Sequence, residues 1–259
     1  MHDAEFEKTR NFWNSVASDW RIQVGKDGDK NRQLNSDPVL WQFAGEVRDR
    51  TVLDAGCGTG YLSQQLTQRG ARVIGVDFSE RMIDIARSDY PALDFRVESC
   101  SELRTIADAS IDLVVSNYVL MDTPDLPGTL RAWHRVLRPG GTAVLIFSHP
   151  CFPGRRARDR LQGTAVSYYW DFSYFETREC VDPPWGHFTE SFIWFHRPLS
   201  EYWKAFSSAG FSVLEFEEPH ITPDRYHLAE TPRRLRNSRT RPYSVAFKLL
   251  EADGKPRAQ

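Results

Sequence analysis

Val52-Leu53-Asp54-Ala55-Gly56-Cys57-Gly58-Thr59-Gly60 is the stretch that decides the fold of this chain. A short apolar run ends in three glycines at alternate positions, and a helical pattern begins directly after them. Such glycines let the backbone turn tightly and let a ligand approach the main chain. The helix that follows offers free backbone N–H groups at its N-terminus. The stretch therefore predicts a buried strand, a ligand-binding turn and a helix.

Strand and helix patterns alternate along the chain around this loop. Short apolar runs have the length of buried strands, and amphipathic helical patterns separate them. Alternation with short turns favours a mostly parallel sheet that helices cover on both faces. We expect strands at 51–55, 72–77, 95–99, 111–117, 142–148, 211–216 and 243–249, the last two antiparallel, and helices at 5–20, from 36, 61–69, 79–88, 126–137 and 199–209, with Ser36, Ser79 and Ser200 as capping residues.

Three kinds of ligand compete for the glycine loop. A nicotinamide-binding loop needs a third glycine where this chain has Tyr61, and a nucleoside triphosphate loop needs a Lys that is absent. S-adenosylmethionine carries no phosphate, and Asp54 suits its cationic ammonium group. Asp77, at the end of the next expected strand, lies where an acid accepts hydrogen bonds from ribose hydroxyls. A strand-turn-helix that merely uses glycines is the remaining alternative, and the sequence favours S-adenosylmethionine.

Four motifs in order resemble those of class I S-adenosylmethionine-dependent methyltransferases. The resemblance covers residues 40–150 well and 195–250 more loosely. It implies a doubly wound α/β fold whose seven-stranded sheet has the order 3-2-1-4-5-7-6, with strand 7 antiparallel and a cap inserted after strand 5. The motifs are Val52–Gly60, Val76–Ser79 with Met82, Ile111–Asn117 and Arg138–Gly141.

The resemblance also implies a set of cofactor-binding residues. Glycines pass under the cofactor, Asp77 holds the ribose, and Phe78 and Met82 flank the adenine. Many members carry an Asp after strand 3, where this chain has Ser99, so adenine recognition is expected to rely on backbone groups. The full set is Asp54, Gly56, Gly58, Gly60, Asp77, Phe78, Met82, Ser99, Cys100 and Asn117.

Residues 150–195 are rich in aromatic side chains and show little periodicity, which indicates a cap over the methyl acceptor. The alternative is that many of these rings form a small core under a long insertion. His149 directly follows the fifth strand and is the candidate general base, because an imidazole titrates near neutral pH. The expected substrate-binding residues are Trp20, Tyr118, Phe152, Tyr169, Trp170 and His196.

We therefore expect a methyltransferase that acts by in-line displacement on an O, N or C atom of a small, aromatic or apolar metabolite. A methyltransferase for RNA or protein, and a non-catalytic S-adenosylmethionine-binding protein, are the alternatives. The expected single domain comprises an N-terminal helical lid (1–35), a cofactor-binding core (36–149), a substrate cap (150–195) and the C-terminal part of the sheet (196–250).

Composition and charge indicate which partners and which cellular compartment to expect for this domain. The chain has 259 residues and a net charge of −2, which gives no general attraction to nucleic acid or membrane. No apolar run approaches a membrane span, and the charged N-terminus lacks a signal core. The four cysteines lack metal or disulfide-framework spacing, so we expect a cytoplasmic protein with reduced thiols and no bound metal. A homodimer is left open.

Overall fold

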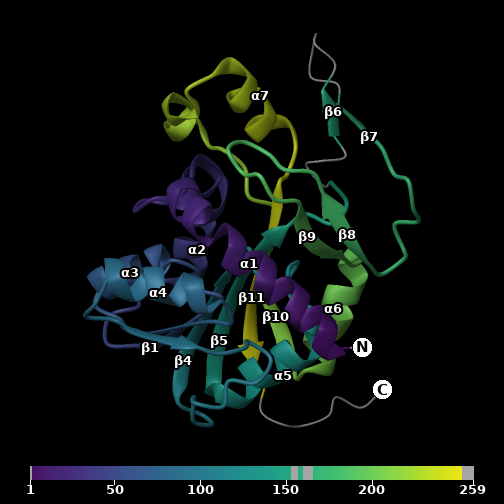
Figure 1. Cartoon of the computed structure of the whole chain (residues 1–259). Coiled ribbons are helices and arrows are strands. Elements are labelled where there is room, and N and C mark those ends of the chain that lie inside the picture. The colour runs from purple at the N-terminus through teal and green to yellow at the C-terminus, as the bar shows by residue number, and fades with distance from the viewer. Residues whose placement is uncertain (1, 153–156, 160–165, 253–259) are drawn as a thin grey trace.

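The computed structural model describes residues 2–152, 157–159 and 166–252, so part of the expected cap lies outside the described residues. Figure 1 shows the arrangement of the elements. The helices are α1 (His2–Val24), the π-helix η1 (Arg32–Ser36), α2 (Asp37–Ala44), α3 (Tyr61–Gln68), α4 (Glu80–Asp89), α5 (Leu126–Val136), α6 (Leu199–Ser208), the 3₁₀ helix η3 (Pro223–Ala229) and α7 (Pro232–Thr240). The strands are β1 (Thr51–Ala55), β2 (Arg72–Asp77), β3 (Asp94–Val97), β4 (Ile111–Asn117), β5 (Leu137–Ser148), β6 (Ala157–Asp159), β7 (Val166–Tyr168), β8 (Arg178–Asp182), β9 (Phe192–His196), β10 (Phe211–Glu217) and β11 (Ser244–Glu251).

The main sheet has seven strands in the order β3-β2-β1-β4-β5-β11-β10. Strands β1 to β5 pair in parallel, and β11 runs antiparallel to both of its neighbours. Counted along this sheet, the order is 3-2-1-4-5-7-6, so the expected topology is confirmed. The parallel arrangement brings the carboxyl ends of β1, β2, β4 and β5 to one edge, where such folds bind ligands.

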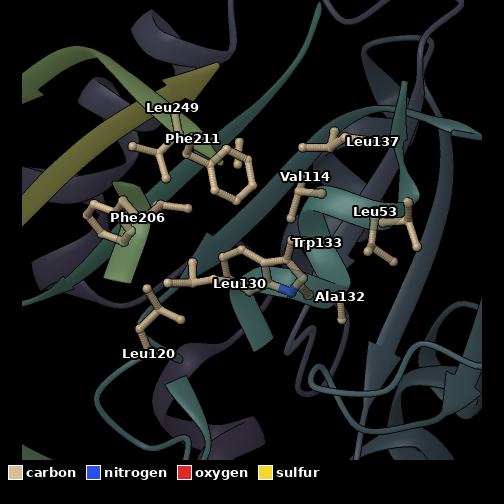
Figure 2. Packing of buried hydrophobic residues seen from close by; sticks show 14 of the residues in the cluster. Leu53, Val114, Leu120, Leu130, Ala132, Trp133, Leu137, Phe206, Phe211 and Leu249 are labelled. Atoms are coloured by element: carbon tan, nitrogen blue, oxygen red, sulfur yellow. The ribbon is translucent and has the colours of Figure 1, made fainter. Parts of the chain in front are cut away.

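Helices cover both faces of the sheet, as the alternating pattern predicts. On one side, α5 and α6 pack against the strands around the fully buried Trp133, which shares a cluster with Leu53, Val114 and Leu130 (Figure 2). On the other side, α2 and α3 bury a second cluster that includes Leu40 and Leu66. Burial of such side chains stabilises the fold by roughly 1.5–3 kcal/mol each, which makes this two-sided core the main source of stability.

Two of the three expected helix caps are wrong. Ser79 caps α4 as predicted, because its hydroxyl accepts a hydrogen bond from the Met82 N–H. Ser36 makes no capping bond, because it is the last residue of the π-helix η1 and has helical backbone angles. Ser200 lies inside α6, which begins one residue earlier with Pro198 as its N-cap. A capping side chain needs a backbone N–H without a helical partner, and sequence alone does not locate it to one residue.

Helix α1 and the β8–β9 hairpin lie over the ligand edge of the sheet. An aromatic cluster joins them through Phe12 and Trp13 on α1 and Phe188 and Phe192 near β9. Figure 1 shows α1 crossing the front of the molecule between α4 and this hairpin. Polar contacts also fix α1, since the Asn14 side-chain oxygen accepts hydrogen bonds from the Ser79 hydroxyl (2.7 Å) and the Arg81 N–H (3.1 Å). The N-terminal helix is thus attached to the start of α4.

The described part of the chain contains no helix that is both long and apolar enough to cross a membrane. All four cysteines lie within the described residues and are free thiols. Within the same ranges, no three His, Cys, Asp or Glu side chains gather in a group that would hold a metal ion.

Candidate active site

The glycine loop after β1 is held close to the neighbouring strand ends. The N–H groups of Gly56 and Cys57 both donate to the Val76 carbonyl at 2.9 Å. A Cβ atom on Gly56 would lie only 2.4 Å from a methyl group of Val119, and Gly56 has a φ of 79°. Only glycine fits here, because the loop after β4 presses against the backbone and the backbone angle disfavours any side chain.

Asp77 completes this loop from the end of β2. Its carboxylate accepts hydrogen bonds from the Gly58 N–H (3.0 Å) and the Ser79 N–H (2.9 Å). The carboxylate therefore lies under the glycine loop and beside the start of α4, in a fixed orientation.

A cavity of about 850 Å³ opens above the loop. Its lining includes nine of the ten residues that the sequence predicts for the cofactor. Gly60 is the exception, because it faces the interior: a Cβ atom there would lie 2.7 Å from the Phe95 ring. The nine are Asp54, Gly56, Gly58, Asp77, Phe78, Met82, Ser99, Cys100 and Asn117.

Two buried carboxyl groups give this cavity its electrostatic character. Burial raises the pKa of Asp54 to about 7, although the Ser63 hydroxyl, which donates to it at 2.6 Å, acts in the opposite direction. Burial likewise raises the pKa of Asp77 to about 6, against the hydrogen bonds from Ser79 and Gly58. Both groups favour a ligand that brings positive charge or hydrogen-bond donors, because either lowers the cost of the buried charge.

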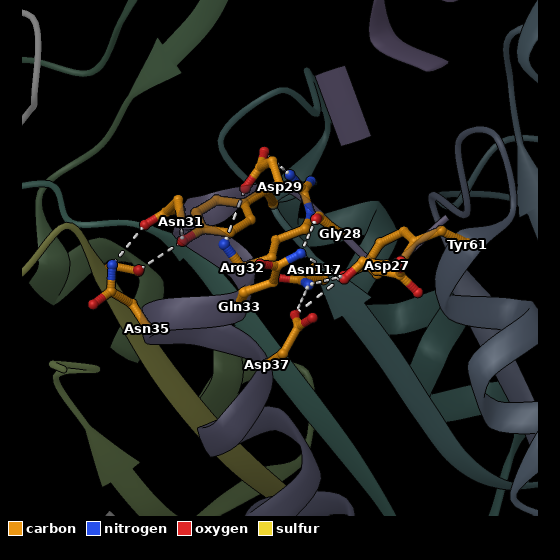
Figure 3. A network of polar contacts seen from close by, with 12 residues as sticks. Asp27, Gly28, Asp29, Asn31, Arg32, Gln33, Asn35, Asp37, Tyr61 and Asn117 are labelled. Carbon is orange, nitrogen blue, oxygen red and sulfur yellow. Dashed lines mark hydrogen bonds and ion pairs between the residues drawn. The ribbon is translucent and has the colours of Figure 1, made fainter. Parts of the chain in front are cut away.

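Arg32, on the π-helix, is buried at the edge of this cavity (Figure 3). Its guanidinium pairs with Asp29 at 2.6 Å. It also lies over the rings of Trp20 (5.4 Å), Tyr61 (5.6 Å) and Tyr118 (5.2 Å), within the range of cation–π attraction. Arg32 thus joins α1, the glycine-loop helix and the loop after β4. Short π-helical turns occur often at functional sites, and this one positions such a residue.

Polar side chains behind Arg32 form a connected network, which Figure 3 shows. The Tyr61 hydroxyl donates to Asp37 (3.1 Å), and the Asn117 amide donates to both of these side chains (3.3 Å to Asp37 and 3.1 Å to Tyr61). Asn117 therefore lines the cofactor cavity and also anchors α2 to the end of β4.

Tyr118 follows Asn117 with a φ of 61°, an uncommon value for a residue with a side chain. Its hydroxyl accepts a hydrogen bond from the Asn31 amide (2.6 Å) and is also hydrogen bonded to the Ser244 hydroxyl (2.8 Å). Strained backbone of this kind is found where the surroundings force it, often at active sites.

A second and larger cavity of about 1,960 Å³ adjoins the first. Trp13, Trp20, Arg32, Tyr118 and Asp122 line both cavities. The lining of the second combines aromatic side chains, such as Trp185, Phe192 and Trp194, with polar and charged ones, such as Asn31 and Arg241. A ligand in the second cavity therefore meets a ligand in the first at this five-residue boundary.

The predicted substrate-binding residues divide into two groups. Trp20, Tyr118 and His196 line the second cavity, whereas Phe152, Tyr169 and Trp170 do not. Tyr169 is exposed, and Trp170 packs against Phe172, Tyr174 and His196. Those three rings pack beside or outside the cavity, as the alternative interpretation of the insertion allowed.

His149 lines the second cavity and is buried. Its Nε2 hydrogen bonds the Glu218 carboxylate (2.8 Å), and its Nδ1 accepts from the Cys151 N–H (3.1 Å). Burial lowers its pKa, and Glu218 opposes that shift. The general-base role of His149 stays a prediction, and this geometry does not favour it, because both ring nitrogens already have partners inside the protein.

Sequence reasoning missed Arg32 and Asp122, which the structure places at the boundary between the cavities. Arg32 lies in a polar stretch without periodicity, and no local signal separates it from other arginines. Asp122 had a usable signal, because it lies five residues after the expected fourth strand, in the loop on the ligand edge of the sheet.

Comparison with known proteins agrees with this arrangement. A methyltransferase domain family matches residues 53–145. A malonyl-[acyl-carrier protein] O-methyltransferase of Hamiltonella defensa is 40% identical over 109 residues, 42% of this chain and 41% of that protein. A ubiquinone biosynthesis O-methyltransferase of Pseudomonas paraeruginosa is 36% identical over 100 residues, 37% of this chain and 43% of that protein. The chain thus spans less than half the length of these two relatives.

The fold resembles solved structures over a greater length. A crystal structure of an S-adenosylmethionine-dependent methyltransferase from Mesorhizobium loti aligns with a TM-score of 0.71 and 22% identity, over 87% of this chain and all of that one. Residues 53–145 match a methyltransferase domain family, and the strand order and the glycine loop are those of the class I S-adenosylmethionine-dependent methyltransferase fold. The cofactor of this class is S-adenosylmethionine.

Proposed function

We propose that this protein transfers the methyl group of S-adenosylmethionine to a small, largely aromatic or apolar acceptor held in the second cavity. The observation that carries the proposal is the pair of adjoining cavities. One has the glycine loop and buried carboxyl groups of a cofactor site, the other has aromatic side chains in its lining, and five residues line both.

The residues of the first cavity fit the cofactor in chemistry as well as in place. Asp54 meets a cationic ammonium group, and Asp77 meets ribose hydroxyls that donate hydrogen bonds. Phe78 and Met82 offer apolar surface to the adenine. Gly58 leaves open space over the loop, since a Cβ atom there would approach only Trp20, at 3.7 Å. These roles follow from the position and chemistry of each side chain.

S-adenosylmethionine supplies an already activated methyl group, so the protein mainly has to align the acceptor and exclude water. Trp13 and Trp20 of α1 line both cavities, and their ring centroids lie 5.1 Å apart. Arg32 holds the Trp20 and Tyr118 rings on opposite elements. These contacts close the site from the side of α1.

The first test is calorimetric titration with S-adenosylhomocysteine, with NAD as the control ligand. Micromolar, one-to-one binding of S-adenosylhomocysteine alone supports the cofactor assignment, and a panel of acceptors can then be screened for methyl transfer. Failure to bind it, or a preference for NAD, contradicts the proposal.

A second candidate is an acceptor carried on an acidic partner protein. Arg234 and Arg241 line the second cavity, and α7 also presents Arg233 and Arg239 as exposed side chains. An acidic carrier could dock there and deliver the acceptor. Turnover with a carrier-bound acceptor that falls steeply with added salt, while turnover with the free acceptor does not, would favour this candidate.

A further inference from the structure

Asp122 lies in the turn after β4, and its backbone N–H donates to the Val119 carbonyl at 2.8 Å. Its side chain lines both cavities. Under the proposed function, on which this inference rests, the methyl group has to cross the boundary between these cavities. Asp122 is the single carboxylate among the described residues that line both.

Arg32 and Tyr118 each have a polar partner at this boundary, although the Arg32 Nε forms no hydrogen bond with the described residues. Arg32 is paired with Asp29, and the Tyr118 hydroxyl is bonded to Asn31 and Ser244. Among the described residues, the carboxylate of Asp122 forms no hydrogen bond with another side chain or backbone group. Asp122 is half-buried rather than enclosed, so its carboxylate can accept a hydrogen bond from a ligand at this boundary.

The charged neighbour of Asp122 does not neutralise it by direct contact. Arg197 is buried, and its guanidinium donates to the carbonyls of Leu120, Thr123 and Pro124, which lie in the same loop as Asp122. Arg197 therefore fixes the shape of the loop and acts on Asp122 through its charge alone.

Burial raises the pKa of Asp122, and Arg197 opposes that shift. The Tyr202 hydroxyl of α6 also interacts electrostatically with Asp122. Tyr118 and Arg32 line both cavities together with it. A cation bound in the first cavity lowers the pKa of a carboxylate that lines that cavity, which favours its ionised form when the methyl donor is present.

We propose that the carboxylate of Asp122 is a catalytic residue that accepts the proton lost by a hydroxyl or amine acceptor during methyl transfer. An O–H or N–H bond of the acceptor breaks, and a bond from that atom to the methyl carbon forms. The electron pair of the broken carbon–sulfur bond stays on the sulfur of S-adenosylhomocysteine. The proton passes to Asp122 and then to solvent.

This assignment also restricts the acceptor. A hydroxyl or neutral amine at the reacting atom donates a hydrogen bond to Asp122, which orients it and removes its proton as the new bond forms. A carboxylate acceptor has no proton to give and is repelled by the charge of Asp122. The acceptor class is therefore one with a hydrogen-bond donor at the methylated atom.

The test compares the wild type, Asp122→Asn and Asp182→Asn. Asp182 is a matched control, because it lines the second cavity but not the first. Calorimetry in two buffers of different ionisation enthalpy, near neutral pH, counts the protons released on binding S-adenosylmethionine and S-adenosylhomocysteine. These ligands differ in the sulfonium charge, so their difference reports a group that faces that charge, whereas Asp54 and Asp77 face parts that both ligands share.

We expect the wild type and Asp182→Asn to release more protons on binding S-adenosylmethionine than on binding S-adenosylhomocysteine. Asp122→Asn should lose this difference. Its Kd for S-adenosylhomocysteine should stay within threefold of the wild-type value. With a hydroxyl or amine acceptor, Asp122→Asn should lower kcat roughly 10²- to 10⁴-fold. An unchanged proton difference in Asp122→Asn, or an unchanged kcat, overturns the inference and leaves the cofactor assignment intact. Failure of the wild type to bind either ligand overturns the proposed function instead.

Discussion

The carboxylate of Asp77, at the end of β2, accepts a hydrogen bond from the backbone N–H of Gly58 at 3.0 Å. The bond joins the glycine loop of β1 to the neighbouring strand end. A second bond from the Ser79 N–H, at 2.9 Å, fixes the same carboxylate to the N-cap residue of α4. Asp77 is therefore oriented by the protein before any ligand enters, so its side chain loses little conformational entropy when a ligand binds.

Asp77→Ala should weaken the binding of S-adenosylhomocysteine. A hydrogen bond to a charged group contributes about 1.5–3 kcal/mol, so one lost bond corresponds to a roughly 10- to 150-fold rise in Kd. Calorimetric titration measures this change. Asp94→Ala is the control, because Asp94 is an exposed residue at the start of β3. If both variants bind as tightly as the wild type, Asp77 has no role in ribose recognition.

The fold was predictable because its signals are local. The run Val52–Ala55 is apolar except for Asp54 and is followed by glycines, and the strand Ile111–Asn117 was predicted with the bounds that the structure gives it. The π-helix η1 was not predicted. Its residues Arg32–Ser36 are mostly polar, and what holds them is the contact of Arg32 with rings from three other segments, a cause that no local pattern reports.

The residues of the first cavity were easier to predict than those of the second, again because their signals are local. The cofactor residues follow strands whose ends meet at one edge, so topology alone places Asp54, Asp77 and Asn117 together. The second cavity is assembled from η1, α7 and the β8–β9 hairpin, and composition does not say which way each ring points. Trp170 and Trp185 both lie in the aromatic insertion, yet only Trp185 lines the cavity.

The ligand-free protein should lose stability as the pH rises. Burial raises the pKa of Asp54 to about 7 and of Asp77 to about 6, above the ordinary value near 3.9. Between about pH 4 and pH 7 the folded state therefore holds more protons than the unfolded state, and the free energy of unfolding falls with rising pH.

The variant Asp54→Asn isolates the larger of these two effects. An amide keeps an oxygen that accepts from Ser63 but never ionises. We expect it to exceed the wild type in free energy of unfolding by on the order of 2–4 kcal/mol at pH 8, with little difference at pH 4. Urea denaturation at both pH values measures this. Equal pH dependence in the two proteins would show that Asp54 does not carry a raised pKa.

Replacing His149 with Ala separates a general base from an anchor. A general base typically contributes roughly 10²–10⁴-fold to kcat. The bonds of His149 to Glu218 and Cys151 favour an anchor that joins the end of β5 to the segment after β10. We therefore expect kcat to change less than about threefold and the midpoint of thermal denaturation to fall. A loss of about 10²-fold or more, with Glu218→Gln unaffected, would instead establish His149 as the base.

Arg32 and Asp29 should behave as a buried pair. Both side chains are nearly inaccessible, and they lie 2.6 Å apart. Removing one partner leaves an uncompensated charge out of water, which costs about 3–5 kcal/mol, whereas removing both does not. Arg32→Met should therefore lower the free energy of unfolding by about that amount.

A double-mutant cycle tests the coupling. In the double variant Asp29→Asn, Arg32→Met, part of the lost stability should return, because no lone charge remains. The flexible Met side chain also keeps contact with the rings of Trp20, Tyr61 and Tyr118. Arg69→Met is the matched control, since Arg69 also lies over an aromatic ring, Trp41 at 3.7 Å, but without a buried acid. Strictly additive losses in the cycle would mean that Arg32 acts only through its contacts with these three rings. Asp29 would then set neither the charge state nor the position of Arg32.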